Sequence, residues 1–154
     1  MASTTFALVL FTLCLATGIQ GDSTPYTSCS TVADPIDFRM DGCTETPCAL
    51  YRGETASAEW DWEVTADTTT LTPRVKAIVL GLSINYDIGQ EDACDTLTNA
   101  ECPLDAGEEV TYGLSMPVLA SYPKLSLTIE FALLDDNGDA QVCFRVPVKV
   151  QDRS

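Results

Sequence analysis

Hydrophobic and polar residues alternate in several segments of the chain. In the segment 56–64, ASAEWDWEV, every even position is apolar and every odd position is polar or acidic. Because successive side chains of a β-strand point to opposite faces, this pattern predicts a strand with Trp60, Trp62 and Val64 on one face and the carboxylates on the other. The same reasoning predicts strands, strongly for the first two segments and more weakly for the others, at 125–133, 142–150, 36–40, 75–86 and 110–118.

A short acidic segment separates the last two strongly alternating strands. Residues 135–139 read Asp-Asp-Asn-Gly-Asp, and Asn-Gly between alternating segments is typical of a hairpin turn because both residues tolerate positive φ. The alternative is a calcium loop of the EF-hand type, which needs Gly at its sixth position and Glu at its twelfth. Counted from Asp135, Gly138 is fourth and the twelfth residue is Val146. We therefore predict a turn.

These strands predict an all-β fold. About seven short strands, each apolar on one face, would form two sheets that pack face to face as an immunoglobulin-like β-sandwich. We find no internal repeat, low-complexity segment or linker in the sequence. A single domain over 22–154 is the expectation.

The N-terminal residues 1–21 are expected to be a signal peptide. The apolar run 6–16 has the length of a signal-peptide core and is too short to span a bilayer. Gly18 and Gly21 offer two cleavage sites. We expect a secreted, extracellular protein, with the endosomal or lysosomal lumen as an alternative destination.

The cysteines agree with a secreted protein. Cys14 lies in the predicted signal peptide, which leaves an even number in the remainder: Cys29, Cys43, Cys48, Cys94, Cys102 and Cys143. An even count behind a leader predicts three disulfides, although the count leaves their pairing open. Six cysteines could in principle bind a metal instead, but secretion favours disulfides.

Charge and composition exclude several functions. The chain carries 8 Lys and Arg against 23 Asp and Glu, a net charge of −15, which repels nucleic acid and favours a monomer. It contains no histidine, so Ser-His-Asp and Cys-His catalysis and the usual zinc sites are excluded. No glycine-rich phosphate loop follows a strand, and a catalytic carboxylate pair would arise only by chance among so many acids. We expect no enzyme activity, no cofactor and no metal.

An ordered set of short motifs resembles a known family. The motifs are CTETPC followed by ALYRG at 43–53, AC and CPL at 93–104, MPV at 116–118, SYP at 121–123, LLDD at 133–136 and CFRVPV at 143–148. From Cys29 to Val150 the chain resembles the ML (lipid-recognition) domain of the Niemann-Pick type C cholesterol-carrier (epididymal secretory) proteins and the group-two mite allergens.

The resemblance implies a fold, a disulfide pairing and a function. The family fold is an immunoglobulin-like sandwich, in agreement with the strand pattern. The implied disulfides are Cys29–Cys143, Cys43–Cys48 and Cys94–Cys102. The implied function is non-catalytic lipid binding and transport, with a sterol, fatty acid or similar ligand between the sheets and a membrane or receptor as the partner in transfer. Two alternatives are an extracellular innate-immune or receptor-interaction module and an arthropod semiochemical carrier.

The resemblance and the alternation together suggest binding residues. By resemblance, Tyr86, Val118 and Tyr122 line the lipid pocket. Alternation adds inward-facing wall candidates, some of which must be ordinary core: Met40, Trp60, Trp62, Leu127, Ile129, Phe131, Phe144, Val146 and Val148. The segment 84–92 is more polar than its proline-rich counterpart in the cholesterol carriers, which leaves fatty acids and other small apolar ligands open beside sterols. The low number of cations disfavours phosphorylated, anionic lipids.

Overall fold

The computed structural model describes residues 21–154. The predicted signal peptide lies outside the described residues except for Gly21, and it stays a prediction. The described chain forms nine strands: β1 (Thr27–Ser28), β2 (Asp37–Met40), β3 (Cys48–Tyr51), β4 (Thr55–Glu63), β5 (Thr72–Val79), β6 (Leu82–Tyr86), β7 (Glu109–Pro117), β8 (Ser126–Leu134) and β9 (Ala140–Gln151). Its one helical element is a short 3-10 turn, η1 (Ala93–Thr96), and no helix in this part could cross a membrane.

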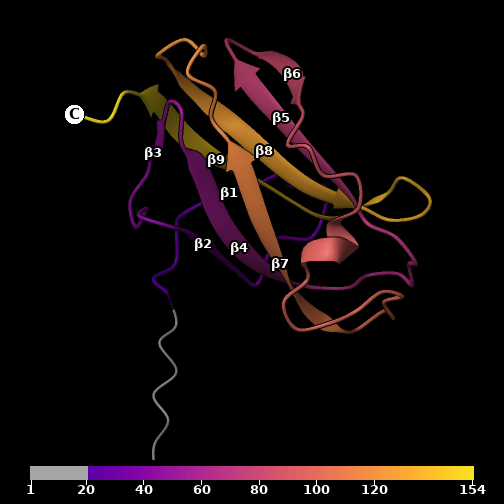
Figure 1. The fold of residues 1–154 in the computed structure, drawn as a ribbon. Helices are drawn as coiled ribbons and strands as arrows, with labels where there is room; N and C mark the ends of the chain where they lie inside the picture. Colours follow the sequence, from indigo (N-terminus) through magenta and orange to yellow (C-terminus); the bar gives the residue numbers. More distant parts are fainter. Residues whose placement is uncertain (1–20) are drawn as a thin grey trace, which may run out of the picture.

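The strands form two sheets that face each other. The larger sheet has the order β1-β9-β8-β5-β6, with β3 paired in parallel to β9, and the smaller has the order β2-β4-β7. Figure 1 shows β4 and β7 in front of β8 and β9. The predicted all-β, immunoglobulin-like sandwich is confirmed, with two short strands, β1 and β3, that the alternation did not indicate.

The prediction of a single strand over 75–86 is wrong. The chain turns back at Leu80 and Gly81, whose φ angles are 50° and 79°, and Val79 pairs with Leu82 across the turn. Two successive residues with positive φ make the tight turn whose twist suits an antiparallel hairpin. The sequence hid this turn because a leucine occupies the position where Asn, Asp or Gly is usual.

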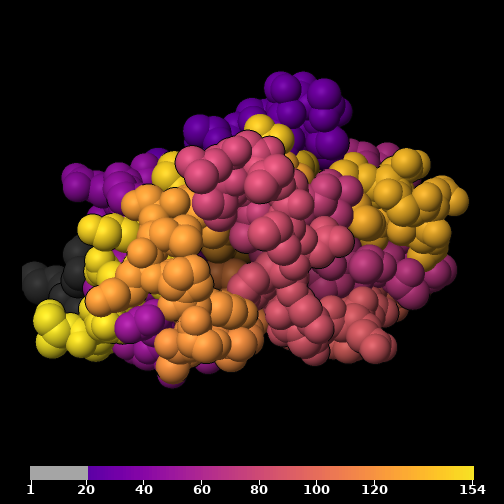
Figure 2. Space-filling model, turned by 90° about the horizontal axis from the view of Figure 1, so that it is seen from above, coloured from indigo at the N-terminus to yellow at the C-terminus, as the bar shows by residue number. Residues whose placement is uncertain are grey.

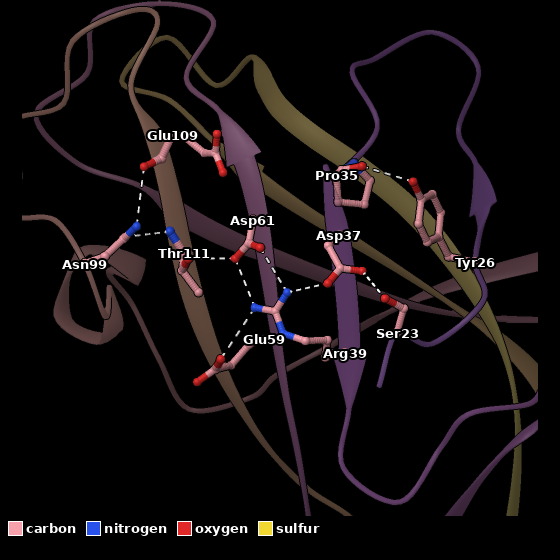
Figure 3. Close-up of polar contacts among 10 residues, drawn as sticks. All are labelled: Ser23, Tyr26, Pro35, Asp37, Arg39, Glu59, Asp61, Asn99, Glu109 and Thr111. Carbon is pink, nitrogen blue, oxygen red and sulfur yellow. Dashed lines mark hydrogen bonds and ion pairs between the residues drawn. The ribbon is translucent and has the colours of Figure 1, made fainter. Parts of the chain in front are cut away.

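Alternation correctly divided β4 between the core and the solvent. Trp60 and Trp62 are buried, whereas Glu59 and Glu63 are exposed. On this outer face Arg39 of β2 binds Asp61 of β4 through two hydrogen bonds of 2.9 and 3.0 Å (Figure 3). These charge-assisted bonds raise the pKa of Arg39 and lower the pKa of Asp61, so both groups stay charged.

Arg39 also connects the neighbouring segments of the smaller sheet. Its guanidinium donates to Asp37 at 2.7 Å, and the Thr111 hydroxyl of β7 donates to Asp61 at 2.6 Å (Figure 3). All three strands of the sheet therefore share one polar network on the solvent side.

Aromatic side chains fill part of the space between the sheets. Ring centroids lie between 4.6 and 6.3 Å apart in a cluster of buried residues: Phe38, Trp60, Tyr112, Phe131 and Phe144. Such pairs add specific contacts to the burial of large apolar surfaces. This part of the sandwich is solid core.

Three disulfides join the pairs that the resemblance implied. Cys29–Cys143 spans 114 residues and fixes the N-terminal segment to β9. Cys43–Cys48 closes the loop between β2 and β3, and Cys94–Cys102 closes the loop that begins at η1. The expected pairing is confirmed.

Candidate functional site: an apolar cavity between the sheets

A cavity of about 260 Å³ lies between the two sheets at one end of the sandwich. Figure 2 looks onto this end and shows a hollow between the pink β5–β6 region and the orange segment that follows β7. Its lining is contributed by both sheets and by that segment: Leu50, Ala77, Val79, Ile84, Asn85, Tyr86, Met116, Val118, Tyr122, Pro123, Leu125, Leu127, Ile129 and Val150. None of these fourteen residues is charged.

The local sequence explains why this end is hollow. Along β8, Phe131 belongs to the aromatic cluster, whereas Ile129, two residues earlier on the same face, lines the cavity. Ala77 of β5 lies opposite both Ile129 and Ile84, so a small side chain stands at the centre of the wall. The cavity has the volume of roughly nine waters at about 30 Å³ each, much more than the voids of a close-packed interior.

Two tyrosines stand at the mouth of the cavity. The Tyr86 hydroxyl donates a hydrogen bond to the Pro117 carbonyl, which connects β6 of the larger sheet with β7 of the smaller one. The rings of Tyr86 and Tyr122 meet edge to face, with centroids 5.7 Å apart. Burial, followed by the neighbouring Tyr122, raises the pKa of Tyr86. The hydroxyl therefore stays protonated and can act as a donor at physiological pH.

Main-chain and side-chain hydrogen bonds hold the mouth segment in place. The Val118 carbonyl accepts from Gly53 at 2.6 Å, and its amide donates to Glu54 at 2.8 Å. Arg52 donates to the Tyr122 carbonyl at 3.1 Å and forms two bonds, of 2.6 and 2.9 Å, with Asp152. The turn between β3 and β4 thus positions both Val118 and Tyr122.

The structure brings together five of the twelve predicted binding residues. Tyr86, Val118, Tyr122, Leu127 and Ile129 line the cavity. The other seven lie outside its lining: Met40, Trp60, Trp62, Phe131, Phe144, Val146 and Val148. The last six are buried in the solid core, where neighbouring side chains fill the space, and Met40 lines an adjacent, more polar depression. The binding role of all twelve stays a prediction.

Several lining residues were not among the predicted twelve. Val150 shares the inward face of a predicted strand, so the alternation could have indicated it. Leu50 lies on β3, a strand too short to give a clear pattern. Ala77 and Ile84 became cavity residues only through the turn at 80–81, which the sequence did not reveal.

One group of potential metal ligands occurs in the described part of the chain. Cys29, Glu130 and Cys143 lie close together, but the two sulfur atoms form a disulfide and Glu130 accepts a 2.8 Å hydrogen bond from Arg145. With its sulfur atoms oxidised and its carboxylate paired, this cluster is a structural one.

A family model described as the ML domain matches residues 23–150. The chain belongs to the ML-domain family. NPC intracellular cholesterol transporter 2 homolog a of Drosophila melanogaster is 32% identical over 114 residues, which cover 73% of this chain and 76% of the relative. The mite group 2 allergen Lep d 2 of Lepidoglyphus destructor is 29% identical over 102 residues, covering 66% of this chain and 70% of the allergen.

Solved structures share the fold of this ML domain. A Niemann-Pick type C2 protein from the Japanese carpenter ant superposes with a TM-score of 0.75 at 19% identity, covering 82% of this chain and 99% of that one. Chicken MD-1, solved with lipid IVa, gives a TM-score of 0.55 at 19% identity, covering 78% of this chain and 83% of that one. The family of sterol carriers is non-catalytic, which agrees with the prediction that this ML domain is not an enzyme.

Proposed function

We propose that this ML domain binds a lipid, either a sterol, a fatty acid or a similar apolar molecule, in the cavity between its sheets and carries it without covalent chemistry. The observation that carries the proposal is an uncharged cavity, far larger than a packing void, between the two sheets. Relatives named as cholesterol transporters and the MD-1 structure with lipid IVa support lipid as the ligand class.

Burial of hydrocarbon would supply the affinity. Each buried methylene contributes about 0.8 kcal/mol, so an acyl chain of about ten methylenes gains roughly 8 kcal/mol before the costs of association. The polar head would remain at the mouth, where Asn85 and the hydroxyls of Tyr86 and Tyr122 can form hydrogen bonds. At about 260 Å³ the cavity suits a small ligand or one whose head protrudes into solvent.

The ligand can be identified directly. The full chain would be expressed in eukaryotic culture, collected from the medium and analysed by native mass spectrometry before and after solvent extraction. We expect recovery from the medium, in keeping with secretion, and a bound lipid of defined mass that extraction removes. A protein that carries no lipid and binds none, yet binds a cell surface, would contradict the carrier proposal and support the interaction module.

A steric variant tests where the ligand lies. Val118→Trp adds a large ring to the cavity wall, and we expect the Kd for a fluorescent fatty acid or sterol to rise at least about tenfold, because the ring occupies the space of the ligand. Leu119→Trp is the matched control, because Leu119 is half exposed and lies outside the lining. Wild-type affinity in a folded Val118→Trp variant would place the ligand elsewhere.

A further inference from the structure

Strand β6 is an edge strand of the larger sheet, and its outer side is unpaired. Its one partner within residues 21–154 is β5, and Figure 1 shows no strand beyond it. At both edges of the smaller sheet, other segments of the chain form hydrogen bonds to the edge strand. Thr24 donates its amide to Phe38 of β2 at 2.7 Å, and Thr98 donates its amide to Thr111 of β7 at 3.0 Å. The edge at β6 differs, because no segment of the described chain pairs with the side of β6 that faces away from β5.

The hairpin geometry shows which main-chain groups of β6 point away from β5. In a two-residue hairpin the pair next to the turn, here Val79 and Leu82, exchanges hydrogen bonds, and bonded and non-bonded pairs then alternate. The amides and carbonyls of Leu82, Ile84 and Tyr86 therefore point to β5. Those of Ser83 and Asn85 point outward. A row of such groups is the complement of another β-strand.

The side chains of β6 lack the features that usually prevent an edge strand from pairing with another chain. Natural edge strands carry charges, prolines or bulges that prevent association. In a chain of net charge −15, the whole segment 77–86 contains no charged residue. Leu82 is 70% exposed and Ile84 is 61% exposed.

The turn before β6 is also unusual. Leu80 is 98% exposed and adopts a φ of 50°, a left-handed conformation that is costly for a bulky side chain. In the described structure this leucine contributes almost no burial to offset that cost.

We infer that β6 is a dimerisation edge, along which two copies of this chain pair antiparallel into one continuous sheet. A two-fold axis at Ile84 places Ser83 of one copy opposite Asn85 of the second copy, so all the outward groups of both residues are paired. Ile84 then faces its own equivalent and Leu82 faces Tyr86, which matches apolar with apolar. Asp87 faces Gly81, so no like charges meet. A second copy is the partner because this edge is its own complement.

The inferred dimer modifies the expectation of a monomer, which rested on charge alone. Two chains of net charge −15 repel each other, but salt screens charges that lie farther apart than the Debye length, about 8 Å at physiological ionic strength. The strands that meet are uncharged. Dimerisation should therefore strengthen as the salt concentration rises, whereas an assembly held by ion pairs would weaken.

A single main-chain donor tests the strand pairing. In Ser83→Pro the outward amide is lost from each copy, while the bonds to β5 remain. We expect the wild-type chain to dimerise in sedimentation equilibrium and the dimer Kd to rise about tenfold or more in Ser83→Pro, because two hydrogen bonds are lost per dimer. Ser83→Ala keeps the amide and should dimerise like the wild type. A wild-type chain that is monomeric at every concentration and salt, or equal dimerisation of the proline and alanine variants, would overturn the inference.

Two further measurements remain informative if the proline variant fails to fold. Leu82→Lys should weaken the dimer, whereas Leu119→Lys adds the same charge outside β6 and should not. Ile84→Cys should give a disulfide-linked dimer on oxidation, because residues opposite each other in a non-bonded antiparallel pair are within disulfide range. Leu119→Cys is its control. Equal cross-linking of the two cysteine variants would exclude the proposed register.

Discussion

At the scale of single residues, most of the basic side chains are already paired within the fold. Six of the eight Lys and Arg residues form ion pairs with carboxylates, all of them within 21–154: Arg39, Arg52, Arg74, Lys124, Arg145 and Arg153. No charged side chain lines the cavity. A lipid head group at the mouth would therefore be recognised through hydrogen bonds from tyrosine and asparagine rather than through a cationic rim.

Asp136 gives a prediction about pH. Its carboxylate accepts from the amides of Thr69 and Thr70 at 2.8 and 3.0 Å and from both hydroxyls, which connects two loops and strongly lowers the pKa of Asp136. A lowered pKa stabilises the fold above the unfolded value, about 4, and the contribution is lost as the pH falls toward the folded value. We expect Asp136→Asn to lower the Tm at neutral pH, and the difference from wild type to shrink below about pH 4.

Asp22→Asn is a control for that experiment, because Asp22 is exposed and makes no hydrogen bond within the described structure. Thermal unfolding of the three proteins across the acid range supplies the measurement. A Tm difference for Asp136→Asn that does not change between pH 7 and pH 3 would show that the carboxylate charge is not what connects the two loops.

At the scale of elements, the sequence predicted the strands better than the site. Period-two alternation located β4, β8 and β9 because one face of each is buried and the other meets solvent. Alternation shows which side chains point inward, but not whether the opposite sheet reaches them. Phe131 and Ile129 follow the same pattern, yet one packs in the core and the other lines the cavity. The hollow depends on contacts between distant segments.

The hydroxyl of Tyr86 connects elements of the two sheets across the mouth. Tyr86→Phe keeps the ring but removes the hydrogen bond to the Pro117 carbonyl. We expect β6 and β7 to separate more easily and a bound fluorescent fatty acid to dissociate roughly fivefold faster, as the loss of about 1 kcal/mol implies. Stopped-flow displacement would measure the rate. Tyr51→Phe, outside the lining, is the control, and an unchanged rate in Tyr86→Phe would show that this bond does not limit release.

At the scale of the whole molecule, the sandwich combines a solid end with a hollow one. The aromatic cluster stabilises the first, while the second loses the contacts that side chains in its 260 Å³ would make. The disulfides limit the consequences of this loss. They restrict the unfolded chain, and that stabilisation does not require a filled interior.

The three disulfides should contribute unequally. In the chain-entropy model, a crosslink over 114 residues stabilises by about 5 kcal/mol and one over five residues by about 2 kcal/mol. Replacing Cys29 and Cys143 together by serine should therefore lower the free energy of unfolding in urea more than replacing Cys43 and Cys48. Cys43 and Cys48 are both buried, whereas Cys143 is buried and Cys29 only partly so; lost packing alone would therefore destabilise the Cys43/Cys48 variant more, which is the opposite order. The first variant should also show a larger m-value, because its unfolded chain becomes less compact. Equal losses of stability with equal m-values would mean that native contacts around the sulfur atoms, rather than restriction of the unfolded chain, determine what each disulfide contributes.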